Sequence, residues 1–160
     1  MEKWYRVYTS DLKCFACGRD NSCGLKMEFE TNGRIMQSET FIAGHHRGWA
    51  SLSHGGVLAT ILDETMSWAA IHFFKKFILT QSMEIEFLKP VYVEKKVLSR
   101  GWIHEQISER KALMKSEILN HDNEVCARAT GKFVLFEPEK FKELKIVPED
   151  LLTEMEGMFN

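Results

Sequence analysis

A histidine, two glycines and an aspartate lie close together in the middle of the chain and could act in one reaction. His54-Gly55-Gly56 precedes a mostly apolar segment, and Asp63 stands nine residues after His54. Glycines at a helix start leave backbone N–H groups free to bind an anion or a polarised carbonyl, and the helix dipole adds a positive potential. A carboxylate in an apolar seam has a raised pKa, which suits a general base near neutral pH. These residues therefore predict an electrophile-binding group and a base.

A helix over residues 55–74 must position these groups. At about 100° per residue, two opposite faces separate. One is an ordinary core-facing stripe, made of Leu58, Ile61, Leu62, Thr65, Ala69 and Phe73. The other is a lane of mostly small residues around the carboxylate, made of Gly56, Thr60, Asp63, Ser67, Ala70 and Phe74. Such a lane lets another backbone pack closely or leaves room for a ligand.

One helix cannot bring both groups to a single reacting atom. At 1.5 Å per residue, Asp63 lies about 12 Å along the axis from the Gly55 amide, whereas a donor and a base must both come within about 3 Å of a reacting carbonyl, or one water further. A second, antiparallel helix must complete the site, and a symmetric dimer is its simplest source. We therefore expect a pair of equivalent sites at a subunit interface.

The rest of the chain predicts strands around this helix. Alternating apolar and polar residues, bounded by turn signals, predict antiparallel strands. The expected strands are residues 25–30, 34–42, 79–87, 97–106, 112–119 and 125–136. We expect a short leading helix within residues 1–13 and a helical or loosely attached segment over 138–160. The sequence thus predicts an α+β fold, an antiparallel sheet wrapped around one long central helix.

Length and charge narrow the classes of function. The 160 residues fit a single domain over residues 1–160, with its core at about 14–136 and a C-terminal extension over 137–160. A formal net charge of −2 does not suggest a nucleic-acid binder. The sequence has no apolar run of membrane-spanning length and no signal-peptide pattern at its start, so we expect a cytoplasmic protein without a membrane partner.

The cysteines raise the question of a metal. Cys14 and Cys17 have the two-residue gap of a zinc knuckle, and Cys23 could supply a third ligand. No second Cys-x-x-Cys or His pair follows at a suitable distance, so we expect reduced thiols in a loop and no metal. Thioredoxin-like redox chemistry is disfavoured because no βαβ pattern surrounds the pair.

The chain resembles hotdog-fold acyl-CoA thioesterases, in the group of the phenylacetate-degradation and 4-hydroxybenzoyl-CoA enzymes. The resemblance spans about residues 14–136. It is carried by Cys14-Phe15-Ala16-Cys17-Gly18 with Asn21 and Gly24-Leu25, by His54-Gly55-Gly56 with Asp63, and by Thr80 with Phe87-Leu88-Lys89-Pro90.

The resemblance implies hydrolysis of an acyl-CoA or aryl-CoA thioester, in which coenzyme A is part of the substrate and no cofactor is needed. The amide of Gly55 or Gly56 would polarise the thioester carbonyl, and Asp63 would act as general base or as nucleophile. Thr80 would position the water. The sites of this family form between subunits, so we expect a homodimer, or a dimer of such dimers.

One departure concerns the loop before the helix. Family members often have Gln or Asn six or seven residues before the His, where this chain has Arg47-Gly48. His45 and His46 stand nearby and could substitute. We expect substrate-binding side chains at Arg47, Ser67 and the two tryptophans Trp49 and Trp68. Lys75, Lys76 and Lys89 could meet coenzyme A phosphates or simply be solvated.

Several alternatives remain open from the sequence. His54 could carry a proton or could only cap the helix, and Glu64 fits a surface or interface residue. A non-catalytic acyl-CoA binding or sensing module would keep the glycine amides but would not need Asp63. A hydratase on a related scaffold expects an Asp and a His five residues apart, and Trp68 stands at that position instead.

Overall fold

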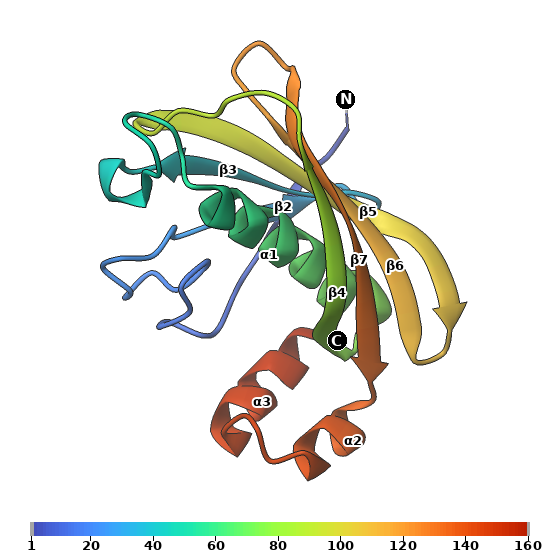
Figure 1. Cartoon of the computed structure of the whole chain (residues 1–160). Coiled ribbons are helices and arrows are strands. Elements are labelled where there is room, and N and C mark those ends of the chain that lie inside the picture. The colour runs from blue at the N-terminus through green and yellow to red at the C-terminus, as the bar shows by residue number, and fades with distance from the viewer. Residues whose placement is uncertain (1, 160) are drawn as a thin grey trace.

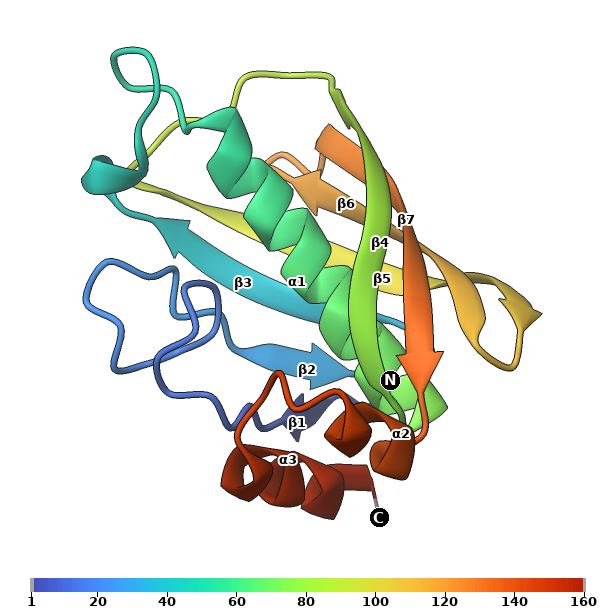
Figure 2. The ribbon, with the colours of Figure 1, turned by 60° about the horizontal axis from the view of Figure 1, so that its bottom comes forward.

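The computed structural model describes residues 2–159 and shows one long helix lying across a curled antiparallel sheet (Figures 1 and 2). The strands are β1 (Tyr5–Val7), β2 (Phe29–Thr31), β3 (Met36–Ile42), β4 (Phe77–Phe87), β5 (Lys95–Ser108), β6 (Lys111–Leu119) and β7 (Val125–Phe136). The helices are α1 (Gly55–Phe74), α2 (Pro138–Glu143) and α3 (Glu149–Glu156), with 3-10 turns η1 (Gly44–His46) and η2 (Gly157–Phe159). The order across the sheet is β1-β2-β3-β5-β6-β7-β4, and every pairing is antiparallel.

The predicted α+β architecture is confirmed, and so are the bounds of the central helix and of the last strand. The prediction of a helix within residues 1–13 is wrong. Tyr5–Val7 form a strand because they find a partner in β2, where Tyr5 lies opposite Thr31 and Val7 opposite Phe29. The expected strand at 25–30 is shorter and begins only at Phe29, after Lys26 adopts a left-handed conformation with φ 53°.

Helix α1 approaches the sheet closely because small residues face it. A Cβ atom added at Gly101 of β5 would lie 2.9 Å from the Thr65 carbonyl oxygen, so only glycine fits there. Hydroxyls fix the register: Thr65 Oγ1 lies 2.8 Å from Ser99 Oγ, and Ser116 Oγ donates to the Leu62 carbonyl at 3.1 Å. These buried contacts set the rotation of α1, and with it the direction in which Asp63 points.

Strand β4 forms the long open edge of the sheet. It pairs with β7 on one side only and lies at the end of the strand order. Its side chains are largely exposed, with Phe87 at 56% and Leu79 at 39%. Only Lys75 and Lys76 separate the end of α1 from the start of β4, so the two elements run in opposite directions.

The C-terminal residues fold into short helices at one end of the sheet (Figure 2). Phe77, Phe141 and Leu152 form a small apolar cluster, in which the rings of Phe77 and Phe141 stack at 5.0 Å. The helical alternative for 138–160 is therefore confirmed over the described residues. No helix within residues 2–159 is long and apolar enough to cross a membrane.

Candidate active site

Asp63 and Thr80 meet between α1 and the edge strand. Thr80 Oγ1 donates a hydrogen bond of 2.8 Å to Asp63 Oδ1. Asp63 is partly buried on the helix, and Thr80 lies exposed on β4 beside a bulge between Thr80 and Ser82. The structure thus brings together a carboxylate and a hydroxyl that stand 17 residues apart in the sequence, one on α1 and the other on β4.

The environment of Asp63 suits a base. Burial raises the pKa of the Asp63 carboxyl, and the hydrogen bond from Thr80 lowers it in part. Burial disfavours the charged form, whereas a donor to the carboxylate favours it. Together, these two effects leave Asp63 with an increased affinity for a proton, and the Thr80 hydroxyl fixes the position of one of its oxygens.

The start of α1 settles which glycine amide is free. His54 is the N-cap residue, and its Nδ1 accepts a hydrogen bond of 2.9 Å from the N–H of Gly56. Within residues 2–159, no acceptor receives the N–H of Gly55. Gly55 lies beside the Phe87 ring, since an added Cβ would come within 3.6 Å of its Cζ atom. The Gly55 amide, rather than the Gly56 amide, is therefore available to polarise a carbonyl.

The capping bond also indicates the tautomer of His54. An imidazole Nδ1 that accepts a hydrogen bond belongs to the neutral ring with its proton on Nε2. The backbone N–H of His54 donates to the His46 carbonyl at 3.0 Å, which ties the cap to the preceding loop. Of the two alternatives for His54, the structure shows the capping contact.

The four expected substrate-binding residues fall into two groups. Arg47 and Trp49 are exposed in the loop before α1, and Trp49 is 87% exposed. Ser67 and Trp68 are buried on α1. Trp68 packs on Phe29 at a ring separation of 6.2 Å. It also lines a cavity of about 220 Å³ whose other walls include Ile71, Met158 and Phe159, and which neither Asp63 nor Thr80 lines.

Three of the other basic side chains considered for the site, His46, Lys76 and Lys89, are already engaged. His46 is buried with Nε2 2.9 Å from the Cys23 carbonyl oxygen, so it orders the N-terminal loop. Lys76 pairs with Glu137 at 2.6 Å and Lys89 with Glu124 at 2.5 Å. Lys75 ends α1 in a left-handed conformation and is exposed.

Glu64 differs from the expectation of a surface or interface residue. Its Oε1 accepts a hydrogen bond of 3.0 Å from Trp68 Nε1 and lies 3.7 Å from Cys14 Sγ. Burial, followed by the charge of Cys14, raises the pKa of Glu64 to about 7. Within residues 2–159, the group that could hold a metal is Cys14, Cys17 and Glu64, because their ligand atoms all lie within 4.8 Å of one another. The Cys-x-x-Cys spacing in the sequence indicated two of these three residues. It could not indicate Glu64, which stands fifty positions after Cys14.

Comparisons with known proteins agree with this architecture. A model of the thioesterase superfamily matches residues 52–127, which include the start of α1, Asp63 and Thr80. The acyl-coenzyme A thioesterase THEM4 of Rattus norvegicus is 28% identical over 97 residues, which cover 60% of this chain. The matched region corresponds to 41% of the length of that relative.

Solved structures show the same fold at low sequence identity. The Escherichia coli PaaI protein from the phenylacetic acid degradation operon superposes with a TM-score of 0.64 at 16% identity, covering 71% of this chain and 81% of that one. A hypothetical thioesterase protein from Streptococcus pneumoniae TIGR4, solved with coenzyme A, gives 0.60 at 19% identity, covering 64% and 81%. The architecture of the chain is therefore the hotdog fold.

Proposed function

We propose that this protein hydrolyses acyl-CoA or aryl-CoA thioesters, with Asp63 as the catalytic carboxylate. The observation that carries the proposal is the Asp63–Thr80 pair, a partly buried carboxyl of raised pKa held by a hydroxyl at 2.8 Å. The free Gly55 amide at the start of the same helix supplies the second requirement, a donor for the thioester oxygen. A module that only binds acyl-CoA has no use for such a carboxylate.

A twofold axis near Met83 and Glu84 of β4, halfway between Thr80 and Phe87, would complete each site. Asp63 lies beside Thr80, the fourth residue of this strand, and Gly55 lies beside Phe87, its last residue. A twofold axis exchanges the two ends of a strand that pairs with its own copy. It would therefore place Gly55 of the partner subunit next to Asp63 of the first. The open edge of β4 and its exposed Leu79 and Phe87 support this pairing.

In the general-base form of the reaction, the Asp63 carboxylate takes a proton from water while the water oxygen bonds to the thioester carbon. The carbonyl oxygen becomes an oxyanion, which accepts a hydrogen bond from the Gly55 N–H of the partner subunit. The carbon–sulfur bond then breaks, and the coenzyme A sulfur receives the proton from Asp63. In the nucleophilic form, Asp63 bonds to the same carbon and the carbon–sulfur bond breaks, so coenzyme A leaves as a thiolate. Water then hydrolyses the anhydride to the free acid and the Asp63 carboxylate, and the thiolate takes the proton that this step releases.

A panel of aliphatic and aromatic acyl-CoA esters tests the activity, with released coenzyme A measured by a thiol reagent. Aromatic esters belong in the panel because of the likeness to the PaaI protein. We expect Asp63→Asn to lower kcat/KM by at least about 100-fold. Equal release by both proteins would remove Asp63 from the mechanism. Binding of the esters without hydrolysis would favour the acyl-CoA binding module.

Gly55→Pro tests the oxyanion donor with little change in shape. Proline is well tolerated at the first position of a helix, and the extended backbone of His54 (ψ 136°) suits a residue before proline. The substitution removes the N–H, whereas the control Gly55→Ala keeps it and places its Cβ at an ordinary 3.6 Å from Phe87. We expect Gly55→Pro to lose about 100-fold in kcat, and Gly55→Ala to lose much less.

Mixing two inactive proteins tests whether the site is shared. In a heterodimer of Asp63→Asn and Gly55→Pro subunits, one site carries both defects and the other carries neither. Random exchange of equal amounts should therefore restore about one quarter of wild-type activity. If each subunit held a whole site, the mixture would stay as inactive as its components.

A further inference from the structure

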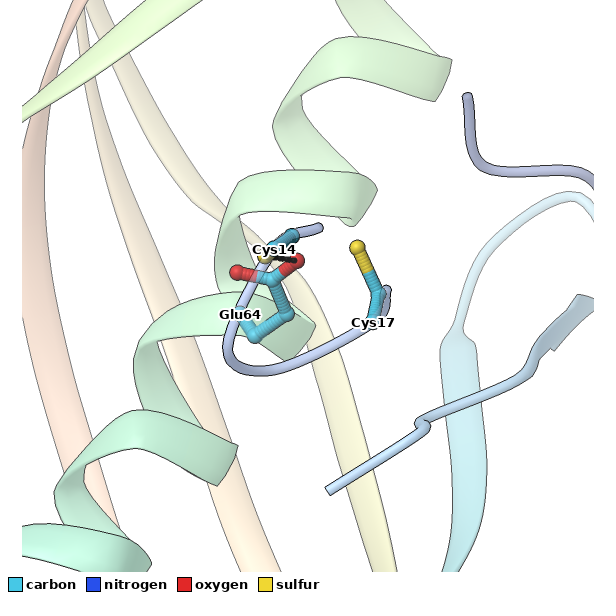
Figure 3. A group of neighbouring side chains, drawn as sticks. All are labelled: Cys14, Cys17 and Glu64. Carbon is cyan, nitrogen blue, oxygen red and sulfur yellow. Dashed lines mark hydrogen bonds between the residues drawn. The ribbon is translucent and has the colours of Figure 1, made fainter. Parts of the chain in front are cut away.

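The CxxC loop and α1 bring three side chains together on one face of the helix. Figure 3 shows Cys14 and Cys17 reaching from the loop toward Glu64 on α1. Their two sulfurs and one carboxylate oxygen lie within 4.8 Å of one another, and Cys14 Sγ is 3.7 Å from Glu64 Oε1. Asp63 and Glu64 are adjacent, so this cluster and the proposed catalytic carboxylate lie on neighbouring faces of one helical turn.

The spacing of these atoms suits a tetrahedral metal ion. Zinc binds thiolate sulfur at about 2.3 Å and carboxylate oxygen at about 2.0–2.2 Å, which places neighbouring ligand atoms about 3.5–3.8 Å apart. The Cys14–Glu64 separation already has this value. Cys23, the third ligand suggested by the spacing in the sequence, is exposed, and it is not part of the group.

The loop is built tightly enough to hold its two sulfurs in place. The N–H of Gly18 donates to the Cys14 carbonyl at 2.9 Å, and the N–H of Asp20 donates to the Leu12 carbonyl at 3.0 Å. A Cβ at Gly18 would lie 2.5 Å from the Cys14 backbone, so this turn closes only on glycine. The site is therefore preorganised by backbone contacts rather than by the sulfur atoms themselves.

The cluster gathers acidic groups without a matching cation. Three groups that become anionic on losing a proton share a small, partly buried volume, and within residues 2–159 Glu64 forms no ion pair with a lysine, an arginine or a histidine. The Trp68 indole N–H orients the Glu64 carboxylate at 3.0 Å, as an outer partner of a metal ligand does.

We propose that Cys14, Cys17 and Glu64 bind one zinc ion per chain, with a water or another external ligand in the fourth position. Two thiolates select a borderline-soft cation over Mg²⁺ or Ca²⁺. The ion would join the N-terminal loop to the middle of α1, beside the residue that we propose as the catalytic base. This inference does not depend on the proposed hydrolase activity.

Zinc content and cobalt spectra test the site on the full chain, kept under a phosphine reductant. After incubation with Zn²⁺ and dialysis, we expect one equivalent of zinc in the wild type and in Cys23→Ser, the matched control. Cys14→Ser and Cys17→Ser should retain none. Glu64→Gln keeps both thiolates and should bind at least about tenfold more weakly in a chelator competition. Co²⁺ added to the wild type should give the intense visible bands of a tetrahedral site and a sulfur-to-cobalt charge-transfer band.

Three results would overturn the proposal outright. These are wild-type protein without stoichiometric zinc, loss of zinc in Cys23→Ser, and a cobalt complex without the charge-transfer band. Circular dichroism checks that each variant is folded. If a cysteine variant unfolds, the wild-type cobalt spectrum and Glu64→Gln decide, and unchanged affinity in Glu64→Gln removes the carboxylate from the site.

Discussion

At the scale of a single residue, two opposing effects act on the pKa of Asp63. Burial raises this pKa and so increases the affinity of the carboxylate for a proton. The hydrogen bond from Thr80 lowers it and so favours the ionised form, which is the form that acts as a base. Because Thr80 is on the edge strand and Asp63 is on the helix, the balance depends on how closely these two elements pack.

The pH dependence of the reaction should report this balance. Since the base must be ionised, log kcat/KM rises with pH and levels off above the raised pKa of Asp63. Thr80→Val removes a donor that lowers this pKa, so the rising limb should move to higher pH. Ser82→Ala, a neighbouring hydroxyl of β4, serves as the control and should leave the midpoint in place. A midpoint that stays fixed or falls in Thr80→Val would show that the limb belongs to another group.

The Asp63 carboxylate should also lower the free energy of unfolding at neutral and higher pH. The pKa of Asp63 is raised in the folded state, so folding binds extra protons and stability falls as pH rises from the unfolded pKa through the folded one. Asp63→Asn removes the buried charge, so its midpoint of thermal unfolding should exceed that of the wild type at pH 8. The advantage should vanish at pH 3, where both states of the wild type are protonated. A variant that is less stable at both pH values would contradict this account.

At the scale of the element, the position of α1 depends on small residues of the sheet beneath it. Glycine at position 101 and the hydroxyls of Ser99 and Ser116 let the helix come close and fix its rotation. Asp63 points to Thr80 because Leu62 and Thr65 are held by the sheet on the other side.

Gly101→Ala should therefore destabilise the fold. The added methyl group would lie 2.9 Å from the Thr65 carbonyl oxygen, a backbone atom that can yield only if α1 shifts. We expect a loss of about 1–3 kcal/mol in the free energy of unfolding, measured by urea denaturation. Gly157→Ala is the matched control, because nothing lies within 4 Å of its Cβ position. Equal stability of both variants would show that the helix adapts freely.

The elements differ in how well the sequence predicts them. Helix α1 has its predicted bounds because its caps and its apolar stripe are local signals. The short strand β1 could not be predicted, because Tyr5–Val7 become a strand only by pairing with residues more than twenty positions away. Asp63 and Thr80 follow from pattern and resemblance, whereas Glu64 reads as a solvated acid until the fold places the CxxC loop against it. Both β1 and the position of Glu64 depend on contacts between segments that are distant in the sequence, and local patterns do not reveal such contacts.

For the whole molecule, β4 leaves one long edge of the sheet open, and most of its side chains are exposed. The open edge of a strand offers unpaired backbone N–H and C=O groups to another strand. This edge also runs from the Asp63 end of the proposed site to the Gly55 end. Assembly and activity should therefore depend on the same strand.

Leu79→Lys should separate the subunits and abolish activity together. The lysine would place a charge on β4, at a side chain that is 39% exposed in the single chain and that pairing would bury. We expect at least a tenfold weaker dimer by light scattering across a dilution series, with activity falling in parallel. Ile107→Lys changes a similarly exposed apolar residue, 47% exposed at the end of β5, and should alter neither property. A Leu79→Lys protein that is monomeric and fully active would show that each chain holds a complete site, since a shared site cannot survive loss of its partner.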